Sequence, residues 1–172
     1  MTLRGRQNQT HTLLETSSFL VVRLGDSYVA LPADGVHGVF TQEEAGKEQA
    51  VTTAGITYQP VDLAQRLSVV ADLSGLESRT VLYSNGRSHG AIGVSQVVGL
   101  TDVERKDCLP LPAQFQREER NWIDGIMLYQ DQLVLILNPS WAVGELADIV
   151  PVAVGQVGQI TAATPAAVDG SC

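Results

Sequence analysis

Residues 79–94 read RTVLYSNGRSHGAIGV, and this stretch decides the fold class. An apolar run of strand length, 79–84, is followed by Asn85-Gly86 and then by a second run at 88–94. Asn and Gly both tolerate positive φ, so this dipeptide between two apolar runs is a strong signal for a hairpin turn. The stretch therefore predicts two antiparallel β-strands.

Similar apolar runs recur along the chain on both sides of this hairpin, at 19–24, 28–32, 35–40, 56–63, 96–100, 122–129 and 132–137. Gly25-Asp26-Ser27 and Gln130-Asp131 supply turn residues between neighbouring runs. Short strands at close spacing with turn signals are typical of a β-sandwich or β-barrel. The order of strand, turn, strand, strand, loop, strand and short helix occurs twice, which predicts an all-β chain made of two small barrels.

The polar segments predict the organisation around these strands. Asp62 can cap a short helix in which Leu63 and Leu67 share a buried face, and 41–50 is expected to be an exposed loop. We expect a flexible leader at 1–18, a folded domain at 19–148 and a low-complexity tail at 149–172. An additional strand at 150–160 is left as an alternative. The first barrel is expected at about 19–70 and the second at about 79–148, and an exchange of strands between them is left open.

Composition excludes several functional classes. The 172 residues carry a net charge of -8 and no basic run, which counts against nucleic-acid binding and membrane-surface binding. No apolar run is long enough to span a bilayer, and 1–9 lacks the apolar segment of a secretory signal. Cys108 and Cys172 are too far apart in sequence to suggest a disulfide framework or zinc site. We therefore expect a cytoplasmic protein without a metal or other cofactor.

Several segments, taken in order and spacing, resemble the CheW-like domain family of chemotaxis adaptor proteins over about 19–143. They are the first hairpin with 36–40, the stretch GITYQPVDL at 55–63, Asn85-Gly86-Arg87 with Gly90, the Pro-rich loop 109–112, and the closing hairpin at 122–126 and 131–137. No single segment is specific, but their combined order is. The chain is identified as a divergent member of that family.

This resemblance implies the architecture and the class of function. It implies two SH3-like β-barrels of about five strands each, packed on a shared hydrophobic seam, with short helices. It implies no active site. It further implies a non-catalytic adaptor that couples a CheA-type histidine kinase to chemoreceptors, binding the kinase regulatory domain and the receptor cytoplasmic tip.

The resemblance also suggests which residues meet these partners. A receptor groove between the barrels would be lined by Val36, Val39, Val97 and Val98, although strand valines are as readily core residues. The kinase-facing surface would lie near Gly55, Tyr58 and Val61. Trp122 is a candidate anchor, because Trp is over-represented among residues that dominate binding energy.

Two departures from the family pattern bear on the receptor. Gly38 stands where the family often has Glu, and Ala54 stands where it often has Arg. Loss of both charges avoids leaving one of them unpaired. The departures predict that this member recognises partners differently, and they count against the standard receptor contact. A kinase-binding scaffold without receptor coupling is therefore an alternative.

A second alternative is a small β-barrel hydrolase or ligand-binding domain. It would require His37, Asp62 and Ser95 to converge in space, since catalytic triads need no fixed order in sequence. Nothing near Ser95 marks an activated nucleophile. Gly46-Lys47 lacks the remaining residues of a phosphate-binding loop, because position 41 is Thr41 and position 48 is Glu48. We therefore expect no enzymatic activity.

Overall fold

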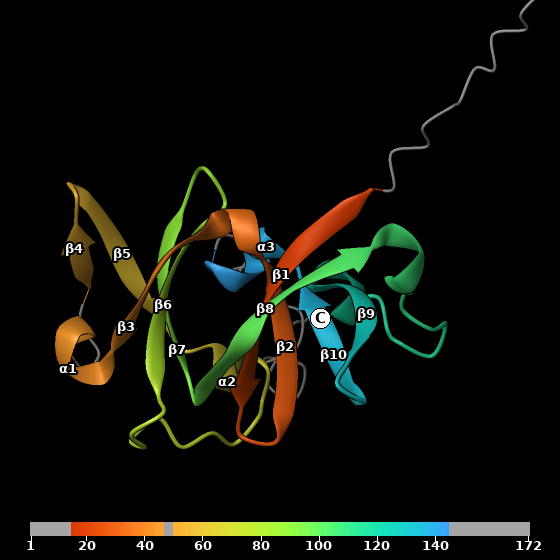
Figure 1. The fold of residues 1–172 in the computed structure, drawn as a ribbon, viewed down its shortest axis with the longest axis horizontal. Coiled ribbons are helices and arrows are strands. Elements are labelled where there is room, and N and C mark those ends of the chain that lie inside the picture. The colour runs from red at the N-terminus through yellow and green to blue at the C-terminus, as the bar shows by residue number, and fades with distance from the viewer. Residues whose placement is uncertain (1–14, 47–49, 145–172) are drawn as a thin grey trace, which may run out of the picture.

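The computed structural model describes residues 15–46 and 50–144, which form two five-stranded β-sheets (Figure 1). The first sheet has the order β8-β1-β2-β10-β9. Its strands are β1 (Thr16–Leu24), β2 (Ser27–Pro32), β8 (Gln96–Glu104), β9 (Ile123–Tyr129) and β10 (Gln132–Leu137). The second sheet has the order β3-β6-β7-β5-β4. Its strands are β3 (Val36–Thr41), β4 (Val51–Thr53), β5 (Ile56–Val61), β6 (Arg79–Ser84) and β7 (His89–Val94). The predicted all-β class is confirmed.

Short helices connect the strands. They are α1 (Gln42–Ala45), α2 (Leu63–Arg66), α3 (Pro139–Ala142) and the 3-10 turns η1 (Ala33–Gly35), η2 (Arg105–Asp107) and η3 (Glu119–Asn121). The predicted cap at Asp62 is confirmed, since its Oδ1 accepts from the Gln65 amide at 2.9 Å. The loop expected at 41–50 instead contains α1, because Thr41 and Glu44 form a capping box that satisfies free backbone amides.

The two sheets are not divided at residues 70–79, where the boundary between the two barrels was expected. The N-terminal hairpin β1–β2 joins the C-terminal strands, because β1 pairs with β8 and β2 pairs in parallel with β10. The second sheet is built from the contiguous stretch between β3 and β7. Local turn signals specify only hairpin partners, whereas these pairings join strands far apart in sequence, so the exchange left open above had no local signature.

Two turns differ in how they close. Gln130 and Asp131 both have positive φ, 48° and 64°, as a two-residue hairpin turn with a matching twist requires. At the β6–β7 hairpin only Gly86 has positive φ. Asn85 uses its side chain instead, accepting from the amides of Arg87 and Ser88 at 2.9 and 2.8 Å. The hairpin prediction is confirmed there, but the turn is longer than the dipeptide suggested.

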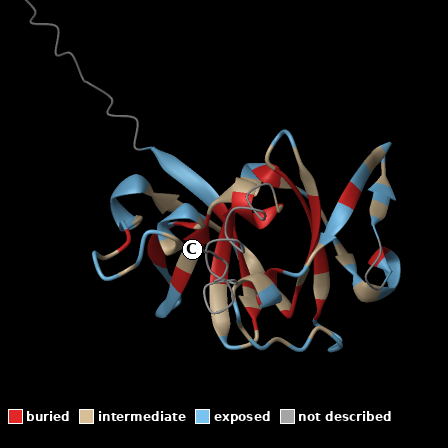
Figure 2. Ribbon diagram, turned by 180° about the vertical axis from the view of Figure 1, so that it is seen from behind, coloured by how far each residue is buried: buried red, intermediate tan, exposed pale blue. Residues whose placement is uncertain are grey.

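The main core is the seam between the sheets. It joins buried side chains of β1 and β2 to others from β6, β7, α2 and α3, and its members include Leu24, Leu31, Leu63, Tyr83 and Trp141. Figure 2 shows the buried residues concentrated where the sheets meet. A smaller cluster fills the first sheet around Met127 and Val134, and another fills the second around Tyr58 and Leu82. The predicted shared hydrophobic seam is therefore present.

The termini differ from the expected boundaries where they are described. Residues Thr16, Ser17 and Ser18, assigned above to the leader, belong to β1, where they pair with β8. Residues 1–14 and the tail from 145, including the strand left open at 150–160, lie outside the described residues. Within the described part of the chain, no helix combines the length and apolarity needed to cross a membrane.

Candidate partner-binding surface

Strands β3 and β8 each lie at one edge of their sheet, with β4 and β9 at the opposite edges. Figure 1 draws β3 and β8 in front of the strands they cross. Edge strands leave one row of backbone donors and acceptors without a neighbour in the sheet. Because the four valines suggested by the family resemblance lie on these two strands, the structure brings them to the sheet edges that flank the seam.

Burial separates these valines. Val36 and Val97 are half-buried and pack against the seam core, one from each sheet. Val98 packs against the cluster inside the first sheet. Val39 remains 42% exposed and lies opposite Val81 of β6, beyond the bulge that interrupts β3 between Val36 and Gly38. Val39 is therefore the most exposed of the four valines, while the others pack against the clusters beneath their strands.

Leu100 is an exposed apolar residue that the sequence analysis missed. It lies on β8 opposite Leu20 of β1 and is 68% exposed. The apolar run 96–100 predicted a strand, but it did not indicate which face of that strand would be exposed. Val39 and Leu100 together place one large apolar side chain on each of β3 and β8.

The residues suggested for the kinase-facing surface lie around the β4–β5 hairpin. Ala54 and Gly55 form its turn with positive φ, 51° and 79°, and both are exposed. Val61 is half-buried and packs against the seam core. Tyr58 is 2% exposed, and its hydroxyl is hydrogen bonded to His37 Nδ1 at 2.7 Å. Tyr58 therefore belongs to the core of the second sheet, and the hairpin turn is the accessible part.

Trp122 precedes β9 rather than lying in a strand, because it follows the 3-10 turn η3. Its ring stacks on Trp141 with centroids 5.0 Å apart. The guanidinium carbon of Arg66 lies 4.2 Å from the Trp141 ring centroid, and Arg66 also donates to the Trp141 carbonyl. Burial lowers the pKa of Arg66. Trp122 thus closes a packed aromatic and cationic cluster at the seam and is only half-exposed.

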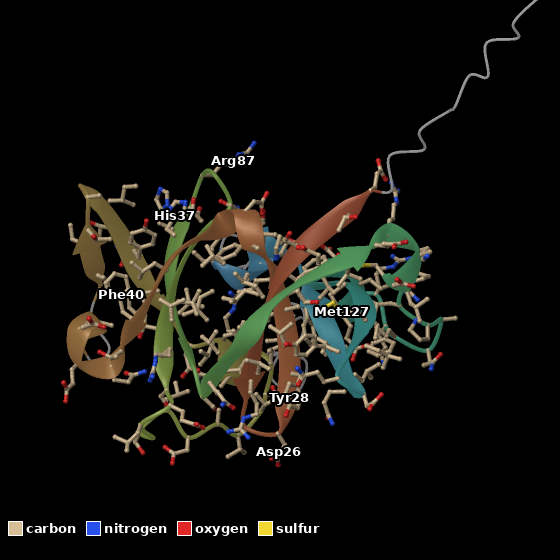
Figure 3. The ribbon with its side chains drawn as sticks, in the orientation of Figure 1. Asp26, Tyr28, His37, Phe40, Arg87 and Met127 are labelled. Atoms are coloured by element: carbon tan, nitrogen blue, oxygen red, sulfur yellow. The ribbon has the colours of Figure 1, made fainter. Side chains whose placement is uncertain are left out.

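Phe40 occupies the space beside Gly38. A Cβ atom at Gly38 would lie 2.9 Å from a ring carbon of Phe40, and Phe40 in turn packs against the cluster of Tyr58 and Leu82. Figure 3 labels Phe40 on β3. An aromatic side chain therefore stands where a side chain at position 38 would project, and the contact there is apolar.

The residues of the hydrolase alternative each have a structural partner. The Ser95 hydroxyl accepts from the Gly25 amide at 3.0 Å, Asp62 caps α2, and His37 is bonded to Tyr58. Gly46 ends α1, and its amide donates to the Gln42 carbonyl. Burial, followed by the charge of Asp107, raises the pKa of the Cys108 thiol, which makes its reactive thiolate less available. These groups form no catalytic triad.

Comparisons with known proteins identify the family of this chain and support its fold. The family model described as CheW-like domain matches residues 18–146. The chain is similar in fold to the scaffolding protein TtCheW from Thermoanaerobacter tengcongensis, with a TM-score of 0.60 and 16% sequence identity, over 72% of this chain and 90% of that one. No curated protein matched the sequence. The two five-stranded sheets correspond to the paired SH3-like barrels of this fold. The chain belongs to the CheW-like domain family.

Proposed function

We propose that this protein is a cytoplasmic, non-catalytic adaptor that couples a CheA-type histidine kinase to chemoreceptors by protein–protein binding. The observation that carries the proposal is the family match, which spans nearly the whole described two-sheet domain. CheW-like domains form a family of non-catalytic scaffolds in chemotaxis signalling.

The arrangement of the edge strands supports a receptor-facing surface on β3 and β8. Val39 and Leu100 are large, apolar and exposed, one on an edge strand of each sheet, and each could contribute an apolar contact to a partner. The exposed β4–β5 turn at Ala54 and Gly55 is the kinase-facing surface in this proposal. The net charge of -8 favours partner surfaces that carry basic residues.

Calorimetric titration with the regulatory domain of a CheA kinase from the same organism tests the proposal. We expect a dissociation constant on the order of micromolar or tighter. Ala54→Asp should weaken this binding, since it adds a charge at the exposed turn in a conformation that Asp tolerates. Leu76→Asp adds the same charge in the loop before β6 and serves as the control. Absence of binding between two folded proteins would rule out the adaptor mechanism.

A second candidate is a scaffold that binds the kinase without receptor coupling. The apolar contact between Phe40 and the Gly38 position favours it, because the polar pair common in the family has no counterpart here. Titration of a receptor cytoplasmic-tip peptide distinguishes the two. Receptor binding by the parent protein that is lost in Val39→Asp supports the coupling adaptor, whereas kinase binding without peptide binding supports this second candidate.

A further inference from the structure

A cavity of about 600 Å³ opens at one end of the second sheet. Strands β5 and β7 end there, and β6 begins there. Thr80, Ala91 and Gly93 line it, and Thr80 lies directly opposite Gly93 in the β6–β7 register. Ala91 and Gly93 are alternate residues of β7 and so face the same side of the strand. Ala91 and Gly93 project little or no side chain from this face of β7, which lets Leu73 approach the strand closely.

The cavity has apolar walls from several elements. Val51 of β4 and Pro60 of β5 contribute to its lining, as does Leu73 from the loop before β6. A Cβ atom at Gly93 would lie 3.0 Å from a terminal methyl carbon of Leu73, so this leucine reaches across the floor. A volume of this size with both apolar and polar groups in its lining is large enough for a small organic molecule.

The polar groups of the lining specify the charge of a ligand. Gln42, Ser74 and Thr80 are neutral, and Asp62 is the only ionisable residue among the described lining residues. One oxygen of its carboxylate accepts from the Gln65 amide. A carboxylate accepts several hydrogen bonds, so Asp62 can also receive one from a ligand. An anionic ligand would meet a like charge in this cavity, whereas a cation would meet a complementary one.

We propose that this cavity binds a small organic cation, with an apolar body against Val51, Pro60 and Leu73 and a protonated amine paired with Asp62. The cavity uses neither the edge strand β8 nor the exposed turn at Gly55, although its lining includes Val61, which the family resemblance places near the kinase-facing surface. Its ligand class is a primary amine attached to an aromatic or branched aliphatic group.

Nuclear magnetic resonance titration of the full chain tests the site with three probes of similar size: phenethylamine, neutral 2-phenylethanol and anionic phenylacetate. We expect phenethylamine to bind with a dissociation constant on the order of millimolar. Its perturbations should centre on the backbone amides of Val61, Ala91 and Gly93. The amine should bind about threefold tighter than the alcohol, as expected for a partly exposed ion pair, and the acid should bind weakest.

Two variants separate the contributions of charge and space. Asp62→Asn removes the charge, and Asn is as good a helix cap as Asp, so the amine should lose its advantage over the alcohol. Gly93→Val suits a strand but must displace Leu73, whose methyl carbon would lie 3.0 Å from the new Cβ. Because this narrows the cavity, all three probes should lose binding. The proposal is overturned if phenethylamine binds Gly93→Val as it binds the parent, or perturbs only scattered acidic residues. It is equally overturned if phenylacetate binds as tightly as the amine.

Discussion

Single hydrogen bonds from side chains connect parts of this molecule that are distant in sequence. The Tyr83 hydroxyl donates to the Pro32 carbonyl at 2.9 Å and thereby joins β6 of one sheet to the end of β2 in the other. The Ser95 hydroxyl accepts from the amide of Gly25 in the β1–β2 turn. Such bonds are strong determinants of position, because a buried group left without its partner costs about 1–3 kcal/mol.

Tyr83 gives a prediction for alkaline pH. Burial, followed by the charge of Asp34, raises the pKa of Tyr83 above its ordinary value. The unfolded chain then loses this proton at a lower pH than the folded chain, so the stability it supports is intact below about pH 10 and falls as pH rises above that value. We expect the free energy of unfolding of Tyr83→Phe, measured by urea titration at a series of pH values, to fall less steeply above about pH 10 than that of the parent. Tyr129→Phe, at a half-exposed site, is the control, and an equally reduced slope there would contradict the assignment.

At the scale of elements, hairpin turns set local pairing. Gln130 and Asp131 adopt positive φ although neither is glycine, so the β9–β10 turn stores some backbone strain. The turn nevertheless keeps the register in which Tyr129 lies opposite Gln132. The backbone conformation of these two residues therefore depends on the flanking strands as much as on their own conformational preferences.

Relief of this strain is a second prediction. Asp131→Gly should stabilise the protein by up to about 1 kcal/mol, because relief of a left-handed conformation that costs roughly 1–2 kcal/mol exceeds the roughly 0.5–1 kcal/mol lost through the greater freedom of Gly in the unfolded chain. Thermal unfolding monitored by circular dichroism measures the change. Asp26→Gly is the comparison, since Asp26 lies in the β1–β2 turn but is not among the residues with positive φ. It should give no gain.

At the scale of the whole molecule, the two sheets share one core. Trp141 is 1% exposed and belongs to the seam cluster together with residues of both sheets. The first sheet closes only when the N-terminal hairpin meets β8 and β10. The described domain should consequently unfold as a single cooperative unit.

Removal of Trp141 tests this cooperativity. Trp141→Ala should destabilise the domain by about 3–5 kcal/mol, as expected when a large aromatic is deleted from a core. Hydrogen exchange should show the amides of β2 and β7 losing protection together, because one core supports both strands. Loss of protection confined to one sheet would indicate that the sheets unfold independently.

The sequence by itself determined the strands, because alternating and continuous apolar runs with turn residues between them are local signals. It also determined the Asp62 cap and, through the ordered segments from 19 to 143, the family. These features depend on neighbouring residues. The hairpin at Asn85-Gly86 and the turn at Gln130-Asp131 were found for the same reason.

Only the tertiary structure decided which strands share a sheet and which side chains remain exposed. The β1–β8 and β2–β10 pairings join distant segments, and the sequence pattern is the same for either partner. Tyr58 and Val39 are both apolar strand residues, yet one is buried and the other is exposed, because exposure depends on what packs above each face. The cavity beside Gly93 likewise exists only because β5, β6, β7 and the loop with Leu73 enclose it.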